Sequence, residues 1–273
     1  MATPLRPLST GELLDRTFSL YRNHFLLFFG VAALPHLVLL AYTLAGLAIR
    51  PNAPQSFTTI LWSLLWGLGT AVLSLLVGAT AQAGTVIAVS EVHLERPASV
   101  MAAFSRVTPR IATVIGLTIV MGIAIAIGFV LLIVPGVLLI LIWSLAVPVA
   151  VLENKGVGDS LSRSYQLTQG HWGRIFVIWL LFFVLSLAVA GLLQWPILFA
   201  TAAESRAGGA TTVLVALQVV SAVISFATQS LVSPLATIAF SLVYYDERVR
   251  KEAFDLQWMM AALDTTQVPA TPL

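Results

Sequence analysis

The stretch ILWSLLWGLGTAVLSLLVGATAQAGTVIAV, residues 60–89, contains no Asp, Glu, Lys or Arg. Uncharged apolar runs longer than about 18 residues are typical of membrane-spanning helices. At about 1.5 Å per residue, this run is longer than a hydrocarbon core of about 30 Å requires. We therefore expect a transmembrane helix that tilts, kinks or projects beyond the bilayer.

Similar runs recur along the chain and predict six membrane-spanning helices. The five others are residues 25–49, 111–133, 136–152, 175–200 and 211–245. The run at 136–152 is short for a full crossing. Charged residues make up 10% of the chain, compared with about 25% of a soluble domain. These observations predict an all-α, polytopic membrane protein built as three helical hairpins.

The distribution of basic residues predicts the topology. Of the 14 lysines and arginines, all except Arg50 and Arg206 lie in the N-terminal segment, residues 90–110, residues 153–174 or the C-terminal segment. Basic residues accumulate on the cytoplasmic side of membrane proteins. We therefore expect both termini in the cytoplasm, with a single membrane domain over residues 1–260 and a disordered tail over 261–273.

The segment VYYDERVRKEAFDLQWM, residues 243–259, is unusually charged for this chain. Opposite charges lie four residues apart in four pairs: Asp246–Arg250, Glu247–Lys251, Arg248–Glu252 and Lys251–Asp255. Such pairs support a helix by a few tenths of a kcal/mol each. The pattern favours a salt-bridged helix that anchors the last span. The alternative is a docking surface, through Arg248, Arg250 and Lys251, for a protein partner or anionic lipid headgroups.

The segments that precede the odd-numbered spans resemble one another. LLDRTFSLYRNHF, residues 13–25, and SLSRSYQLTQGHW, residues 160–172, share the spacing of their leucine, arginine, aromatic and histidine positions. The middle segment SVMAAFSRVTPRI, residues 99–111, matches more weakly. Each segment reads as a short amphipathic cytoplasmic helix, and Ser9 with Glu12 has the spacing of a capping box.

These similarities predict three repeats, residues 9–89, 97–152 and 159–245, each an amphipathic helix followed by a hairpin. The alternative is a chance likeness between amphipathic helices. Four side chains of these segments are candidates for contact with lipid phosphates: Arg16, His24, Arg163 and His171. They are equally well explained as headgroup-level residues that only set the topology.

Uncharged polar residues inside the spans are the candidates for an intramembrane site. Gln218, Ser225 and Gln229 lie on roughly one face of the last span, together with Ser221. Gln82 lies among small residues of the second span, and His36 is the one histidine well inside a span. Such residues either join helices by hydrogen bonds or line a polar cavity for an amphiphile or small solute.

Signatures of catalysis are lacking. No Asp, Glu, Lys or Arg lies well inside a predicted span, which disfavours proton-coupled transport. The four histidines show no metal-binding spacing, and the chain has no cysteine and no GxSxG motif. The net charge of +2 is too small to indicate nucleic-acid binding. We expect no catalytic residues, no metal and no cofactor.

Three segments resemble the membrane domain associated with glycerophosphoryl diester phosphodiesterases. They are STGELLDRTFSLYRNHF (9–25), VPGVLLILIWSLAVPVAVLENKGVGDSLSRSYQLTQGHWGRIF (134–176) and SPLATIAFSLVYYDERVRKEAFDLQWM (233–259). The resemblance implies a bacterial protein of the inner membrane, similar to the stand-alone forms of actinobacteria. In the fused enzymes, catalysis belongs to a separate soluble barrel with paired histidines and metal-binding carboxylates. This chain is too short to hold that barrel, so phosphodiesterase activity is not carried over.

Two functions remain open. The first is a non-enzymatic membrane scaffold or partner-binding module of the cell envelope, with the bilayer, anionic headgroups and a protein at the cytoplasmic face as partners. The second is a transporter or lipid-handling protein with a polar intramembrane cavity. A membrane-embedded lipid enzyme is disfavoured, because the sequence offers no enclosed set of acid, histidine and metal ligands.

Overall fold

The computed structural model describes residues 8–49, 56–208 and 210–252. Within these residues the chain is helical and has no strand, which confirms the all-α prediction. The helices are α1 (Thr10–Asn23), α2 (Phe25–Ala48), α3 (Phe57–His93), α4 (Val100–Val107), the 3-10 helix η1 (Thr108–Arg110), α5 (Ile111–Leu131), α6 (Ile133–Ile142), α7 (Ala146–Leu152), α8 (Val157–Thr168), α9 (Trp172–Arg206) and α10 (Thr211–Glu252).

Six helical segments of the described chain are long and apolar enough to cross a membrane, as the sequence predicts. They are α2, α3, α4 continued through η1 into α5, α6 with α7, α9 and α10. The structure extends α3 and α9 beyond the predicted spans 60–89 and 175–200. Large apolar side chains are exposed along these helices, as a lipid-facing surface requires.

Short helices precede each hairpin at the predicted places. At the start of α1, the side chains and backbone N–H groups of Ser9 and Glu12 bond reciprocally, which confirms the capping box. The Ser99 hydroxyl caps α4 by accepting the N–H of Ala102 at 3.2 Å. Gly170 follows α8 with φ +89°, a left-handed conformation that glycine adopts without steric cost.

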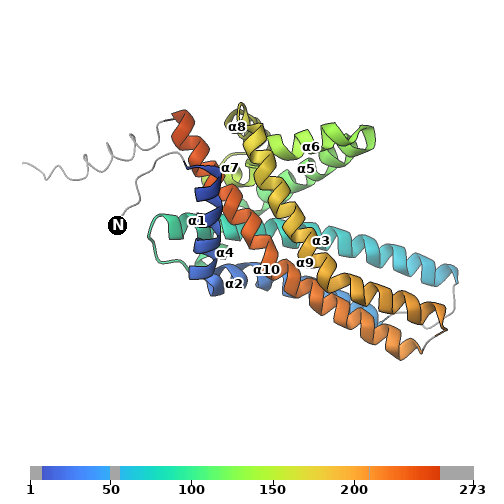
Figure 1. Ribbon diagram of the computed structural model, residues 1–273. Coiled ribbons are helices and arrows are strands. Elements are labelled where there is room, and N and C mark those ends of the chain that lie inside the picture. Colours follow the sequence, from blue (N-terminus) through green and yellow to red (C-terminus); the bar gives the residue numbers. More distant parts are fainter. Residues whose placement is uncertain (1–7, 50–55, 209, 253–273) are drawn as a thin grey trace, which may run out of the picture.

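Helix α10 is the central element of the fold. It packs against α2, α3 and α9, and its C-terminal part also contacts α1 and α8. In Figure 1 the long helices α3 and α9 run along α10, which each of them contacts, whereas the α5–α6 hairpin leaves the bundle in another direction. We call the end of the bundle that holds α1, α4, α8 and the last turns of α10 the charged end. The opposite end holds the last turns of α2 and α9 and the first turns of α3 and α10.

The fourth predicted span, 136–152, is interrupted rather than continuous. Helix α6 ends at Ile142, a turn follows, and α7 begins at Ala146. Pro148 has no N–H to donate to the carbonyl of Ser144, so an unbroken α-helix is disfavoured here. The interruption leaves the Ile142 carbonyl without an intrahelical partner, and the Ser164 hydroxyl of α8 donates to it at 2.7 Å.

The turn between α5 and α6 consists of the single residue Leu132. Glycines allow the two helices to approach closely beside it, because a β-carbon at Gly128 would lie 3.0 Å from the Cα of Gly136. A β-carbon at Gly136 would in turn lie 2.6 Å from the ring of Phe129. Both distances are shorter than ordinary contacts, so the hairpin requires glycine at these positions.

Candidate functional site

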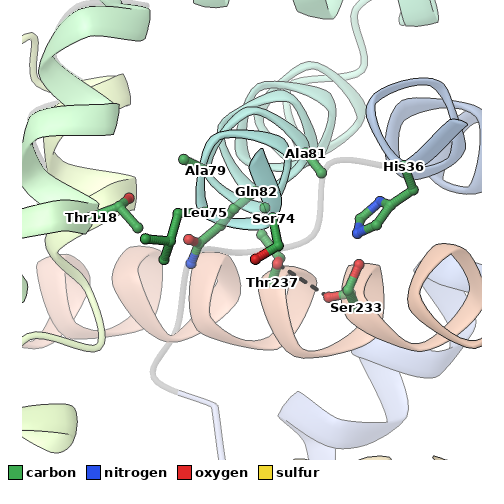
Figure 2. A pocket seen from close by; sticks show the side chains of 10 residues that line it. His36, Ser74, Leu75, Ala79, Ala81, Gln82, Thr118, Ser233 and Thr237 are labelled. Atoms are coloured by element: carbon green, nitrogen blue, oxygen red, sulfur yellow. Dashed lines mark hydrogen bonds between the residues drawn. The ribbon is translucent and has the colours of Figure 1, made fainter. Parts of the chain in front are cut away.

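Two cavities lie between α10 and the first hairpin. The first has a volume of about 300 Å³ and is lined by residues of α2, α3, α5 and α10. Its polar lining consists of His36, Ser74, Gln82, Thr118, Ser233 and Thr237. Figure 2 shows the side chains of α3 and α10 converging on this space, with the His36 ring entering from α2. Small residues of α3, including Gly78 and Ala81, leave the room that the cavity occupies.

The second cavity, of about 440 Å³, lies between α2, α3 and α10. Its polar residues are His36, Thr43, Thr70, Gln218, Ser221, Ser225 and Gln229. Its apolar residues include Leu39, Leu40 and Phe226. His36 lines both cavities, so each space borders this side chain. No charged residue of the described chain lines either cavity.

Most hydroxyl groups in these cavities bond to their own helix. Thr43, Thr70 and Thr118 each donate to the carbonyl four residues earlier, at 2.8 to 2.9 Å. Thr237 donates to the Ser233 carbonyl at 3.2 Å, the contact drawn in Figure 2. These hydroxyls have used their donors and offer a ligand only an acceptor.

The glutamine side chains differ from the threonines. Within the described residues, the amides of Gln82, Gln218 and Gln229 make no hydrogen bond, and Gln218 Oε1 is fully buried. His36 Nδ1 donates to the carbonyl of Ala32 at 2.7 Å, which leaves Nε2 for another partner. The cavities therefore contain three amides and a ring nitrogen that can bind a polar group.

One glutamine joins helices instead. Gln194 Nε2 of α9 donates to Ser225 Oγ at 2.6 Å, and Ser221 Oγ donates to Gln194 Oε1 at 2.9 Å. The same amide also donates to the backbone carbonyl of Ser221 at 3.1 Å. Gln194 thus holds the two serines from the α9 side while the second cavity lies on their other side. Ser221 and Ser225 therefore line the second cavity and also join α10 to α9.

The structure brings the predicted cavity residues together. His36, Gln218, Ser225 and Gln229 line the second cavity, and Gln82 with His36 lines the first. Sequence reasoning noted Thr70 among the polar residues of the second span but missed Thr43, Thr118 and Thr237, because an apolar run gives no sign of which face meets another helix. Thr237 extends the four-residue spacing of Ser225, Gln229 and Ser233, and that spacing is the signal that could have identified it.

The charged end is held by ion pairs around the last turns of α10. The Asp246 side chain is 1% exposed and pairs with Arg174 of α9 and with Arg250, the latter at 2.8 Å. Asp246 Oδ1 also accepts the backbone N–H of Leu8 at 2.6 Å. Arg174 and Arg250 donate to the Leu8 carbonyl at 3.1 and 2.7 Å. Both backbone groups of Leu8 are therefore bound by this cluster.

Glu247 is the most deeply buried acid of the described chain. Its side chain is fully buried and accepts a hydrogen bond from His171 Nδ1 at 2.7 Å. Arg174 lies 3.6 Å from its other oxygen. The predicted pair of Glu247 with Lys251 is wrong. Lys251 instead donates to the carbonyls of Gln166 and Gln169, at 2.7 and 2.6 Å, because α8 packs beside this turn.

Arg163 of α8 links two acids. It donates to Glu153 at 3.3 Å and pairs with Glu252 of α10. Burial lowers the pKa of Arg163, but the hydrogen bond to Glu252 and the charge of Glu153 outweigh burial, so the pKa is raised above its usual value. Arg248 bonds Glu252 at 3.1 Å and the Tyr244 hydroxyl at 3.1 Å. The predicted pairs Asp246–Arg250 and Arg248–Glu252 are thus confirmed.

Arg16 and His24, the remaining candidates for lipid contact, differ in their surroundings. Arg16 Nη2 donates to His93 Nδ1 at 3.3 Å, and burial lowers the pKa of Arg16. His24 is exposed at the junction of α1 and α2. Asp255, the predicted partner of Lys251, and the predicted tail 261–273 lie outside the described residues.

Among the described residues, no group of three or more His, Cys, Asp or Glu side chains is arranged to hold a metal ion. The ionisable groups gather at the charged end, whereas the cavities hold amides, hydroxyls and one histidine. The cavity arrangement can bind a polar group by hydrogen bonds.

Comparison with known proteins identifies a family. The model of the Uncharacterised protein family (UPF0259) matches residues 59–205, more than half of the chain. This match gives no link to the glycerophosphoryl diester phosphodiesterase membrane domain that the three quoted segments resemble. Searches of curated proteins and of solved structures return no match. The chain, a membrane protein with six candidate spans, therefore belongs to the Uncharacterised protein family (UPF0259).

Proposed function

We propose that this protein binds a membrane amphiphile, of the lipid class, in the two cavities between α2, α3 and α10. The observation that carries the proposal is a set of three intramembrane amides, Gln82, Gln218 and Gln229, which line these cavities and make no hydrogen bond within the described residues. An amide in an apolar environment without a partner costs roughly 1–3 kcal/mol in proteins, and Gln218 Oε1 is buried without a partner in the described chain. A ligand that satisfies these amides removes that cost.

The cavity walls suit a molecule with one polar and one apolar part. Leu39, Leu40 and Phe226 stand beside the amides in the second cavity. Ser225 and Gln229 are exposed on the outside of the helix bundle, where the surface of a membrane protein meets lipid. An amphiphile can therefore enter from the bilayer with its tail in lipid and its head against the amides.

The partner-binding function has less support from the geometry. The basic residues that the sequence suggests for contact with a partner or a headgroup are bound to acids or carbonyls of the same chain. Examples are Arg163, Arg248 and Lys251. A docking partner would have to compete with those contacts. For this reason we place the scaffold function second and the lipid-handling function first.

Three further points complete the proposal. The charged end faces the cytoplasm of a bacterial inner membrane, supported by the distribution of the 14 basic residues. The protein acts by binding, without catalysis of its own. The similarity to the membrane domain of glycerophosphoryl diester phosphodiesterases, supported by the quoted segments, suggests a relationship at the level of that membrane module.

Substitution of the amides by methionine tests the proposal. Gln218→Met and Gln229→Met keep the side-chain volume and remove the hydrogen-bonding groups. We expect native mass spectrometry of detergent-purified protein to show retained lipid for the wild type and less for the double variant. Gln166→Leu, an exposed position of α8 outside the cavities, is the matched control and should retain lipid.

Stability measurements separate ligand binding from helix contact. Because neither amide bonds to another described residue, the lipid-free double variant should unfold at the same or a higher denaturant concentration than the wild type. A loss of stability with unchanged lipid retention would show that the glutamines join helices, and would refute the proposal. Absence of retained lipid in the wild type would refute it as well.

A further inference from the structure

Polar residues of α10 form a row that passes both cavities. The row consists of Gln218, Ser221, Ser225, Gln229, Ser233 and Thr237. The first four line the second cavity and the last two line the first cavity. After the first interval of three residues, the members follow one another every four residues. We call this row the α10 polar row.

The length of the row matches the thickness of a membrane. Nineteen helical steps separate Gln218 from Thr237, which correspond to about 28 Å at 1.5 Å per residue. The hydrocarbon core of a bilayer is about 30 Å thick. Gln218 lies toward the opposite end of the bundle, and Thr237 lies nearer the charged end. Polar groups therefore occur at nearly every depth of the membrane along one helix.

The winding of the row explains why there are two cavities. Residues four apart in an α-helix lie on a ridge inclined to the helix axis, so the row turns slowly around α10. The members from Gln218 to Gln229 share the second cavity with Leu39 and Thr43 of α2. Ser233 and Thr237 share the first cavity with residues of α3, including Ser74 and Gln82. The row thus passes from the α2 side to the α3 side.

His36 lies where the two parts of the row meet. It lines both cavities, and its side chain is 7% exposed. Its Nδ1 is engaged with Ala32, and Figure 2 shows the ring directed into the first cavity near Ser233.

The chemistry of the lining selects the headgroup. Amides and hydroxyls donate and accept hydrogen bonds, as a hydroxyl group also does. A phosphate or carboxylate would need a compensating cation in this low-dielectric space, and no Lys or Arg of the described chain lines either cavity. An uncharged headgroup with several hydroxyls, such as a sugar, therefore fits best.

We infer that the two cavities form one path along which an uncharged, hydroxyl-bearing lipid headgroup moves between the leaflets, held by the α10 polar row. This inference rests on the proposed function, since movement requires binding. The tails stay in the bilayer, beside the exposed positions Ser225 and Gln229. Each step along the row exchanges hydrogen bonds with one member for bonds with the next.

Reconstitution into vesicles tests the inference. Phosphatidylcholine vesicles containing the full chain receive a trace of a glucosyl diacylglycerol or a phosphatidylglycerol, each with a fluorescent nitrobenzoxadiazole on an acyl chain. Dithionite added outside destroys only the probe in the outer leaflet. We expect the glucosyl probe to move outward at least about tenfold faster than in protein-free vesicles, which corresponds to about 1.4 kcal/mol of barrier. The anionic probe should move at the protein-free rate.

Ser233→Leu places an apolar side chain in the first cavity, at the row member that follows Gln229, and should return the glucosyl probe to the protein-free rate. Val223→Leu, at an exposed position of α10 outside the row, is the control and should move the probe like the wild type. If Ser233→Leu does not fold, Ser233→Val, which replaces the hydroxyl group with a methyl group and adds a second methyl group, carries the test.

Native mass spectrometry on the same preparations separates the two proposals. Lipid retention without movement of either probe would overturn the path and leave the binding function intact. Equal movement of both probes would overturn the assignment of an uncharged headgroup. Movement that is unaffected by either Ser233 variant would overturn the role of the row, and absence of retained lipid would overturn both proposals.

Discussion

Asp246 Oδ1 accepts a hydrogen bond from the backbone N–H of Leu8 at 2.6 Å, across 238 positions of the sequence. The same carboxylate pairs with Arg174 of α9 and Arg250 of α10. One acid thus joins the segment before α1, the start of α9 and the end of α10. This role explains why charged residues are so frequent in the last turns of α10, because acids and bases pair there inside the protein.

Replacement of Asp246 by asparagine should destabilise the protein strongly. Asparagine can still accept the Leu8 N–H, but it leaves Arg174 and Arg250 without their shared counter-charge. Removal of one partner of a buried ion pair costs about 3 kcal/mol or more. Unfolding by SDS in mixed micelles measures the change. Asp159→Asn, an exposed acid of α8, is the control and should have little effect; equal losses would contradict the prediction.

Ser164→Ala should destabilise the interruption between α6 and α7. The Ser164 hydroxyl is fully buried and satisfies the Ile142 carbonyl, with a longer contact of 3.4 Å from Thr168 as the other donor. Leaving a buried carbonyl poorly satisfied costs roughly 1–2 kcal/mol. The free energy of unfolding should fall by that amount, while Ser162→Ala on the exposed side of α8 should leave it unchanged.

Gly46→Ala should disturb the aromatic stack between α2 and α3. A β-carbon at Gly46 would collide with the indole of Trp66, which stacks on Tyr42 with ring centroids 4.3 Å apart. Overpacking of this kind costs about 1–3 kcal/mol. Near-ultraviolet circular dichroism and unfolding report the change. A β-carbon at Gly67 meets no atom within 4 Å, so Gly67→Ala should be tolerated; similar losses in both variants would disprove the contact.

Cysteine labelling should locate the two ends of the bundle. The chain has no cysteine, so each introduced thiol is unique. Ser105→Cys and Ser162→Cys lie exposed at the charged end, and Thr58→Cys and Thr212→Cys lie exposed at the opposite end. An impermeant maleimide should reach only the latter two in intact cells and only the former two in inverted vesicles. The reverse pattern would refute the proposed orientation.

Local chemistry explains why the helices and several caps are predictable. Long uncharged runs such as residues 60–89 can only satisfy their backbone in lipid as helices. Ser9 and Glu12 cap α1 through atoms three residues apart, and Arg248 reaches Glu252 within one turn. In each case the partner lies in the same segment, so spacing alone identifies it.

The break at Ser144 and the buried pair of Glu247 with His171 required the tertiary structure. The sequence around Pro148 does not indicate whether the helix bends or ends. The interruption depends on Ser164 of α8, which binds the free carbonyl of Ile142. Glu247 had an acceptable partner four residues away in Lys251, but α8 and α9 offered closer ones. Competition between partners is decided by which helices are neighbours, and a sequence pattern does not contain that information.

For the candidate site, too, the sequence determines the chemical groups and the tertiary structure determines their partners. The sequence by itself determined that His36, Gln82, Gln218, Ser225 and Gln229 are uncharged polar groups at membrane depth, because apolar runs on both sides place them there. Only the tertiary structure decided that Ser225 bonds to Gln194 while the three other glutamines face open cavities. The physical reason is that a polar side chain in lipid must find a partner, and the arrangement of α2, α3, α9 and α10 determines whether that partner is another helix or a ligand.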